Sequence, residues 1–175
     1  GYAGRIQSGI LRVGDEVAIL PSGFMSKIKS INAGDVDVEE AFAPMSVSVC
    51  LEDDIDISRG DMIVKKNNQP ETLQEFDIML CWLSRQPAKP RTKYTIMHTS
   101  NEKKAIIKDI VYKMDINKFE KDEDDKELKM NDIARVKLRT THRLMVDTYR
   151  KNRNTGSVIL IDDATKETVA AGMIV

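Results

Sequence analysis

The sequence predicts an all-β protein made of two small antiparallel β-barrels. Short segments rich in β-branched residues alternate with turns that contain Gly, Pro, Asp and Asn. Such spacing is typical of sandwiches and barrels, whereas βαβ units would place long helical patterns between the strands. Near residues 73–82 a weak helical period competes with a strand interpretation.

The boundary between the barrels is predicted at the polar segment 65–71, which contains Pro70. Proline cannot continue a strand ladder, and polar segments of this kind join compact domains. We therefore assign residues 1–66 to a first barrel and residues 71–175 to a second.

The composition indicates a globular protein, because 41% of the 175 residues are hydrophobic and 31% are charged. A net charge of -1 argues against a general polyanion binder, since such proteins carry a cationic excess. We expect no membrane span, as no apolar run approaches the necessary length of about 20 residues. Cys50 and Cys81 lie far apart in hydrophobic segments, which favours two buried free thiols and a reducing, cytoplasmic location.

The first barrel should contain five strands, at residues 3–8, 16–20, 24–32, 45–51 and 62–64. Gly-Asp precedes an apolar segment three times, as GDEVAIL, GDVDV and GDMIV. We interpret this as repeated turn chemistry, because Gly admits a positive φ and Asp can bond its own backbone.

The second barrel should contain strands at residues 73–83, 94–98, 105–116, 133–140, 157–161 and 168–175. The apolar segment 157–161 should be buried and should pair with the closing strand. Residues 120–127 are mostly acidic and include no apolar side chain, which predicts a mobile, solvated loop.

Two basic segments are candidate contact surfaces. In residues 134–139, apolar and basic side chains alternate, so a strand here would present a basic stripe to solvent. A second basic cluster opens the stretch YRKNRNTGSVILIDD at residues 149–163. The candidate contact residues are Arg135, Lys137, Arg139, Arg150, Lys151 and Arg153.

Three interpretations of these basic residues remain open: docking on an acidic protein partner, simple solvation, and nucleic-acid binding. Nucleic-acid binding is the weakest, because aromatic residues form only 5% of the chain and Tyr149 alone lies near the cluster.

Motifs for catalysis, cofactors or metals are not found. The segment 154–157 has one glycine and no following lysine, and a strand succeeds it where a phosphate-binding loop requires a helix. His98 and His142 stand at strand ends, outside any nucleophile motif and without a second ligand at metal spacing. We therefore assign no catalytic, cofactor-binding or metal residue to this sequence.

Several motifs nevertheless carry a family resemblance. GRIQSGILRVGDEV at residues 4–17, followed by ISRGDMI at 57–63, resembles the second domain of translational GTPases. LEDDIDISRGDMIV, and above all DTYRKNRNTGSVILIDDATKETVAAGMI, are similar to the GTP-binding large subunit of bacterial sulfate adenylyltransferase. The resemblance covers essentially all 175 residues.

This resemblance implies a GTPase domain followed by two barrels like domains 2 and 3 of elongation factor Tu. The phosphate loop, the D-x-x-G switch and the N-K-x-D base reader of that GTPase domain do not occur in the sequence. We therefore expect a fragment that enters the first barrel at Gly1, with an N-terminal strand missing, and that binds neither GTP nor magnesium itself.

The resemblance also implies a reaction and partners. The family converts ATP and sulfate to adenosine 5'-phosphosulfate and pyrophosphate on a small catalytic subunit, and couples this step to GTP hydrolysis. The six basic residues would then contact the small subunit or the GTPase domain. Some relatives carry an adenylylsulfate kinase domain after the large subunit. The alternative is a translation-factor fragment that contacts tRNA or the ribosome.

Overall fold

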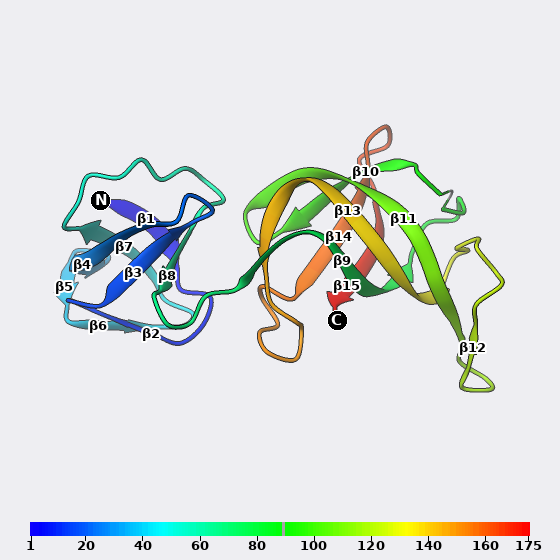
Figure 1. Ribbon diagram of the computed structural model, residues 1–175, viewed down its shortest axis with the longest axis horizontal. Coiled ribbons are helices and arrows are strands. Elements are labelled where there is room, and N and C mark those ends of the chain that lie inside the picture. The colour runs from blue at the N-terminus through cyan, green and yellow to red at the C-terminus, as the bar shows by residue number, and fades with distance from the viewer. Residues whose placement is uncertain (89) are drawn as a thin grey trace. The chain divides into compact units, whose positions relative to one another are not determined.

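The structure is a computed structural model that describes residues 1–88 and 90–175 (Figure 1). The chain divides into two compact units, Gly1–Pro70 and Glu71–Val175. Within the described residues, every regular element of both units is a β-strand, which confirms the predicted all-β class. No helix in this part of the chain is long and apolar enough to cross a membrane.

Unit 1, residues 1–70, has a main antiparallel sheet of order β1-β7-β4-β3-β8, with β5 attached to β4. β2 and β6 form a separate two-stranded ribbon, visible below the main sheet in Figure 1. The strands are β1 (Tyr2–Arg5), β2 (Ile10–Arg12), β3 (Glu16–Leu20), β4 (Phe24–Ala33), β5 (Val36–Val38), β6 (Glu40–Phe42), β7 (Ser46–Leu51) and β8 (Met62–Lys65).

The core of unit 1 follows from the period-two alternation of its strands. In β7, Val47, Val49 and Leu51 are buried, whereas Ser46 and Ser48 are exposed. Successive side chains of a strand point to opposite faces, so this pattern fixes which face of the sheet covers the core. The apolar face of β7 joins buried residues of β3 and β4 in one cluster.

The Gly-Asp pairs close turns, as expected. Gly14 and Gly60 adopt positive φ values of 87° and 100°, which residues with a Cβ rarely reach. The carboxylate of Asp15 accepts the backbone N–H of Arg12, and that of Asp61 accepts the backbone N–H of Ser58.

Three short strands of unit 1 were not predicted. β2, β5 and β6 have three residues each, and so short a segment shows no measurable alternation. The expected strand 3–8 ends at Arg5, since residues 8 and 9 form a bend that leads into β2.

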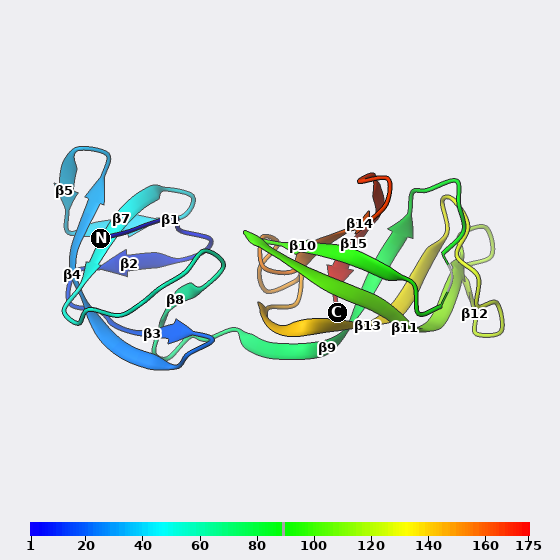
Figure 2. The same cartoon turned by 90° about the horizontal axis from the view of Figure 1, so that it is seen from above.

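Unit 2, residues 71–175, is a closed barrel. Its strands pair in the order β10-β14-β15-β9-β13-β11, and β11 pairs again with β10, which closes a ring of six antiparallel strands. β12 pairs only with the far end of β11 and lies at one end of the barrel (Figure 1, Figure 2). The strands are β9 (Glu71–Trp82), β10 (Lys93–His98), β11 (Asn101–Asp115), β12 (Glu120–Asp122), β13 (Ile133–Val146), β14 (Ser157–Asp162) and β15 (Thr168–Ile174).

The barrel interior is filled by one apolar cluster to which β9, β10, β11, β13, β14 and β15 all contribute. Trp82 packs edge-on against Tyr94, with ring centroids 5.7 Å apart, and its indole N–H donates to the carbonyl of Gln86. The buried tryptophan thus gains apolar contacts and satisfies its one donor. The expected pairing of the strand at 157–161 with the closing strand is confirmed, since Val158 lies opposite Gly172.

Two expectations for unit 2 need correction. The strand predicted to end at Thr140 continues as β13 to Val146, because residues 140–143 form a bulge after which Leu144 pairs with Leu73. The segment 120–127 is not wholly a loop, because β12 pairs with the last three residues of β11. The weak helical period near residues 73–82 belongs to strand β9.

Replacing the fully buried Leu138 by Ala should lower the free energy of unfolding by about 2–5 kcal/mol, because the change removes apolar contacts and leaves a cavity in a closed core. Leu83→Ala is the matched control: its side chain is 42% exposed, and we expect a loss below about 1 kcal/mol. Urea unfolding followed by circular dichroism measures both. Equal losses would contradict the assignment of Leu138 to the barrel core.

Candidate interaction surfaces

The predicted basic stripe exists on the outer face of β13, as the alternation indicated. Ala134, Val136 and Leu138 are fully buried, and the basic residues between them point outward. The stripe, however, lies beside an acidic row on β9 that sequence reasoning missed. Glu75 and Asp77 occupy outward positions of that strand.

The two rows pair their charges. Nε and Nη2 of Arg135 both lie 2.9 Å from Asp77 Oδ2, and Arg139 Nε lies 3.7 Å from Glu75 Oε1. Lys137 lies opposite Asp77 on one side and opposite Asp109 of β11 on the other. The basic stripe is therefore largely neutralised by its neighbours and offers little free positive charge to a polyanion.

The electrostatics of the stripe agree with this pairing. The hydrogen bond to Asp77 raises the pKa of Arg135. The pKa of Glu75 is lowered chiefly by its hydrogen bond from Lys108. Cross-strand pairs of opposite charge add a modest stabilisation to a sheet. A signal for this pairing was present in the sequence, since Glu75 and Asp77 alternate with Phe76 and Ile78.

The second basic cluster lies on a compact loop between β13 and β14, which we call the basic loop, residues 147–156. Lys151 is paired with Asp147 at 2.8 Å, and the Arg153 guanidinium lies 5.9 Å from the centre of the Tyr149 ring. Arg150 is exposed and has no hydrogen-bond or ion-pair partner among the described residues. The basic loop therefore presents Arg150 and Arg153 to solvent, on the opposite end of the barrel from β12 (Figure 1, Figure 2).

The basic loop is held against the barrel by backbone bonds. Tyr149 N–H donates to the carbonyl of Ile174, and Ile174 N–H donates to the carbonyl of Gly156. A Cβ on Gly156 would lie 2.4 Å from Tyr149 Cα and 2.7 Å from the Asn152 oxygen. Only glycine fits this close backbone approach. The TGS segment is thus a structural closure of the loop.

His98 anchors the basic loop from inside the barrel. Its Nε2 lies 2.7 Å from the carbonyl oxygen of Thr155, so Nε2 must carry the proton. Nδ1 is buried and has no hydrogen-bond partner within residues 1–88 and 90–175. Burial lowers the pKa of His98, and the bond to Thr155 and the charge of Asp147 only partly offset this effect. These contacts give His98 a structural role in holding the basic loop.

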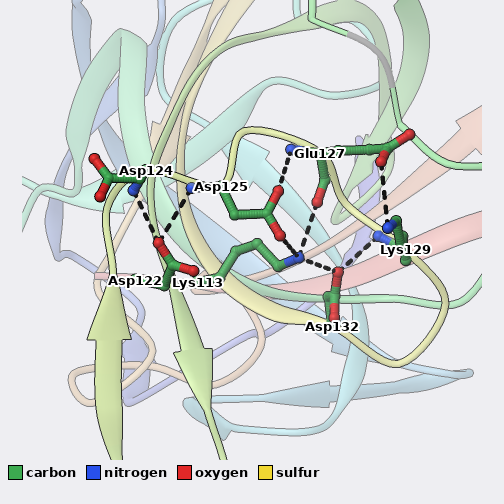
Figure 3. Close-up of polar contacts among 7 residues, drawn as sticks. All are labelled: Lys113, Asp122, Asp124, Asp125, Glu127, Lys129 and Asp132. Atoms are coloured by element: carbon green, nitrogen blue, oxygen red, sulfur yellow. Dashed lines mark hydrogen bonds and ion pairs between the residues drawn. The ribbon is translucent and has the colours of Figure 1, made fainter.

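A group of polar contacts around Lys113, at the other end of the barrel, was not predicted. Lys113 of β11 lies 2.6 Å from Asp125 and 2.7 Å from Asp132, and it also donates to the carbonyl of Glu127 (Figure 3). Burial would lower the pKa of Lys113, but its bonds to the two carboxylates outweigh burial, and the pKa is raised. These contacts order the second half of the acidic segment, and Leu128 beside it is fully buried.

Within the residues the structure describes, no group of three or more His, Cys, Asp and Glu side chains is arranged to hold a metal ion. His142 is exposed on the bulge of β13 and contacts the hydroxyl of Thr141. Cys50 and Cys81 are free thiols as expected, but they are half-buried and not fully buried.

The closed barrel of unit 2 and the antiparallel sheet of unit 1 place the chain in the class of proteins built from two all-β units. Crystal structures of Sup35 complexed with GDP and with GMPPNP match 99% of this chain, with TM-scores of 0.87 and 0.86. The match covers 43% and 42% of those chains, and the sequence identities of 16% and 15% establish a common fold only.

The particular family follows from the sequence of unit 2. Residues 75–175 match the family described as GTP-eEF1A C-terminal domain-like, and the chain belongs to this family.

Curated relatives narrow the likeness further. The chain is 47% identical over 174 residues to the "Bifunctional enzyme CysN/CysC" of Mycobacterium tuberculosis, covering 99% of this chain and 28% of the relative. It is 42% identical to "Sulfate adenylyltransferase subunit 1" of Sulfurovum sp. and 43% identical to that of Bacteroides fragilis, covering all of this chain and 38% and 37% of those proteins. The chain thus spans about a third of the relatives' length, and the resemblance inferred from its motifs is confirmed.

Gly156→Ala should lower the free energy of unfolding by about 1–3 kcal/mol or more, because the new methyl group must displace backbone atoms of Tyr149 and Asn152. Gly4→Ala is the control. No heavy atom lies within 4 Å of a Cβ built there, so its effect should stay within about 1 kcal/mol. Thermal unfolding compares the two, and an unaltered Gly156→Ala protein would refute the close approach.

The free energy of unfolding should decrease as the pH is lowered, because His98 becomes protonated more readily in the unfolded state. Because burial lowers its pKa below 6.5, the unfolded state binds the proton first, and stability is lost as pH falls from 6.5 toward the folded pKa. The contribution of one such group cannot exceed about 1.4 kcal/mol per pH unit. Urea unfolding between pH 7.5 and 5.5 should show a smaller dependence of stability on pH for His98→Gln than for the wild type. The same dependence in both proteins would contradict this role.

Proposed function

We propose that this chain supplies the two β units of a GTP-dependent sulfate adenylyltransferase subunit 1. The observation that carries the proposal is the identity of 40–43% with proteins named sulfate adenylyltransferase subunit 1, over essentially the whole chain. In this proposal the complete enzyme converts ATP and sulfate to adenosine 5'-phosphosulfate and pyrophosphate in the cytoplasm. The chemistry occurs on a separate catalytic subunit, and this chain alone has no adenylyltransferase or GTPase activity.

The two units act in the proposal as rigid bodies that hold a partner and relay the nucleotide state of a GTPase domain. GTP and magnesium bind to that domain, outside the 175 residues of this chain. A closed barrel suits a relay, because an interior packed to crystal-like density moves as one body and does not deform gradually. Its tight interior supports this role: Trp82, Leu138 and Leu144 are all at most 1% exposed.

The basic loop is the best candidate among the predicted contact residues. The stripe on β13 is largely paired within the barrel, whereas Arg150 and Arg153 present their charges at the surface. Exposed arginines can pair bidentately with the carboxylates of a partner. We therefore propose that this loop contacts an acidic patch of the catalytic subunit or of the GTPase domain. The stripe of Arg135, Lys137 and Arg139 mainly stabilises the sheet.

The test is a pull-down of the catalytic subunit on the immobilised chain. Reversing Arg150, Lys151 and Arg153 to Glu should weaken binding about tenfold or more, because attraction becomes repulsion at the contact. A matched control reverses three exposed basic residues of unit 1, Lys27, Lys29 and Arg59, and should leave binding unchanged. Circular dichroism verifies that each variant is folded.

Two outcomes contradict parts of the proposal. If the loop variant binds as the wild type does, the basic loop does not contact the catalytic subunit. If the chain ignores the catalytic subunit but shifts tRNA in a gel with a steep loss of affinity as salt rises, a role in translation replaces the one proposed.

A further inference from the structure

The hairpin β11–β12 lies at one end of the closed barrel. The pairing of β11 with β10 ends at Ile106, but β11 stays paired with β13 as far as Met114, and β12 pairs only with residues 113–115. The carboxylate of Asp115 accepts the N–H groups of Asn117 and Lys118 and so closes the turn between the strands. The hairpin is therefore a defined element that contributes no residue of β12 to the core.

Large apolar side chains are exposed at this hairpin. Phe119 is 84% exposed and Ile116 60%, and Met130 of the neighbouring loop is 48% exposed. Phe119 also adopts a positive φ of 55°, which is strained for a bulky residue with a Cβ. Because its side chain is 84% exposed, Phe119 gains little packing within the described residues to compensate for this strain. Contiguous apolar side chains with a polar rim mark interaction sites on soluble proteins.

The rim of this patch is acidic. Residues 115–125 contain six acidic and two basic side chains. Ile116 and Met130 are among the residues that line a surface hollow of about 340 Å³, and Asp115, Asp122 and Asp132 belong to its polar lining. Lys113 forms ion pairs with Asp132 and Asp125, as Figure 3 shows. Among the described residues, the carboxylates of Asp115 and Asp122 accept hydrogen bonds from backbone N–H groups and form no ion pair.

The exposed apolar side chains and the acidic rim indicate what kind of molecule can bind at the hairpin. The negative rim repels nucleic acid and anionic membranes, whereas Lys or Arg of a protein can lay its aliphatic stem on Ile116 and Met130 and its charge on the carboxylates. We propose that the hairpin, through Ile116, Phe119, Met130 and their acidic rim, docks a protein face with an apolar centre bordered by Lys and Arg. The proposal rests on the proposed function, in that the occupant is the catalytic subunit of the sulfate-activating enzyme.

Isothermal titration of the 175-residue chain with that catalytic subunit tests the proposal. The double variant Ile116→Ser/Phe119→Ser should weaken binding about tenfold or more, because both side chains lose their buried contacts. Glu123→Lys/Asp124→Lys should weaken it as well and reduce its dependence on salt between 0.1 and 0.4 M NaCl. Phe24→Ser is the matched control, since Phe24 is a 62% exposed phenylalanine of unit 1, and it should bind as the wild type does.

The outcomes separate this proposal from the proposed function. Wild-type affinity in both hairpin variants, together with weakened binding on reversal of the basic loop, would overturn the hairpin surface and leave the function intact. Complete absence of binding by the wild-type chain would overturn both. Light scattering that shows a dimer of the chain, lost in the Ile116→Ser/Phe119→Ser variant, would identify a second copy as the occupant and also overturn the proposal.

Discussion

The closure of the ring in unit 2 is the constraint on which the other features of that unit depend. Because β10 pairs with both β11 and β14, each of the six strands has a partner on both sides. A closed sheet removes exposed edges and gives every strand an inner and an outer face. Alternation then assigns Ala134, Val136 and Leu138 to the interior, and the basic residues between them have no position left except the outer face.

Closure also explains why charge on the barrel wall behaves differently from charge at its ends. On the wall, antiparallel neighbours bring Arg139 opposite Glu75 and Lys137 opposite Asp77. Arg135 lies opposite Met79 and reaches Asp77 diagonally, so each basic residue of the stripe has an acid beside it. At the ends, the strands give way to loops, and side chains such as Arg150 and Phe119 extend beyond the paired region. Features available to a partner therefore concentrate in the basic loop and in the hairpin β11–β12.

Sequence alone predicted the class and most strands, because β-branched segments bounded by turns record a local preference. It did not predict β2, β5, β6 and β12, whose three residues are too few to show a period. The bulge at 140–143 was missed because Thr140 is held there by a bond from its hydroxyl to the carbonyl of Gln74, 66 positions earlier. The partners of Lys113 and His98 were not predicted for the same reason. These contacts depend on strand register and on loop closure, which cannot be inferred from the sequence of one segment.

In the motif that most resembles sulfate adenylyltransferase subunits, several residues have a clear role in the fold. In residues 147–156, Gly156 permits backbone contact with Tyr149, and the Thr155 hydroxyl donates to Asp147 while its carbonyl accepts from His98. These contacts fix the shape of the basic loop, yet none of them requires Arg150. A residue that the fold does not need, on a loop that the fold makes rigid, can contribute to binding without losing conformational entropy in the backbone. Arg150 is therefore a better candidate for the proposed contact than Arg135 and Arg139, which are paired on the barrel wall.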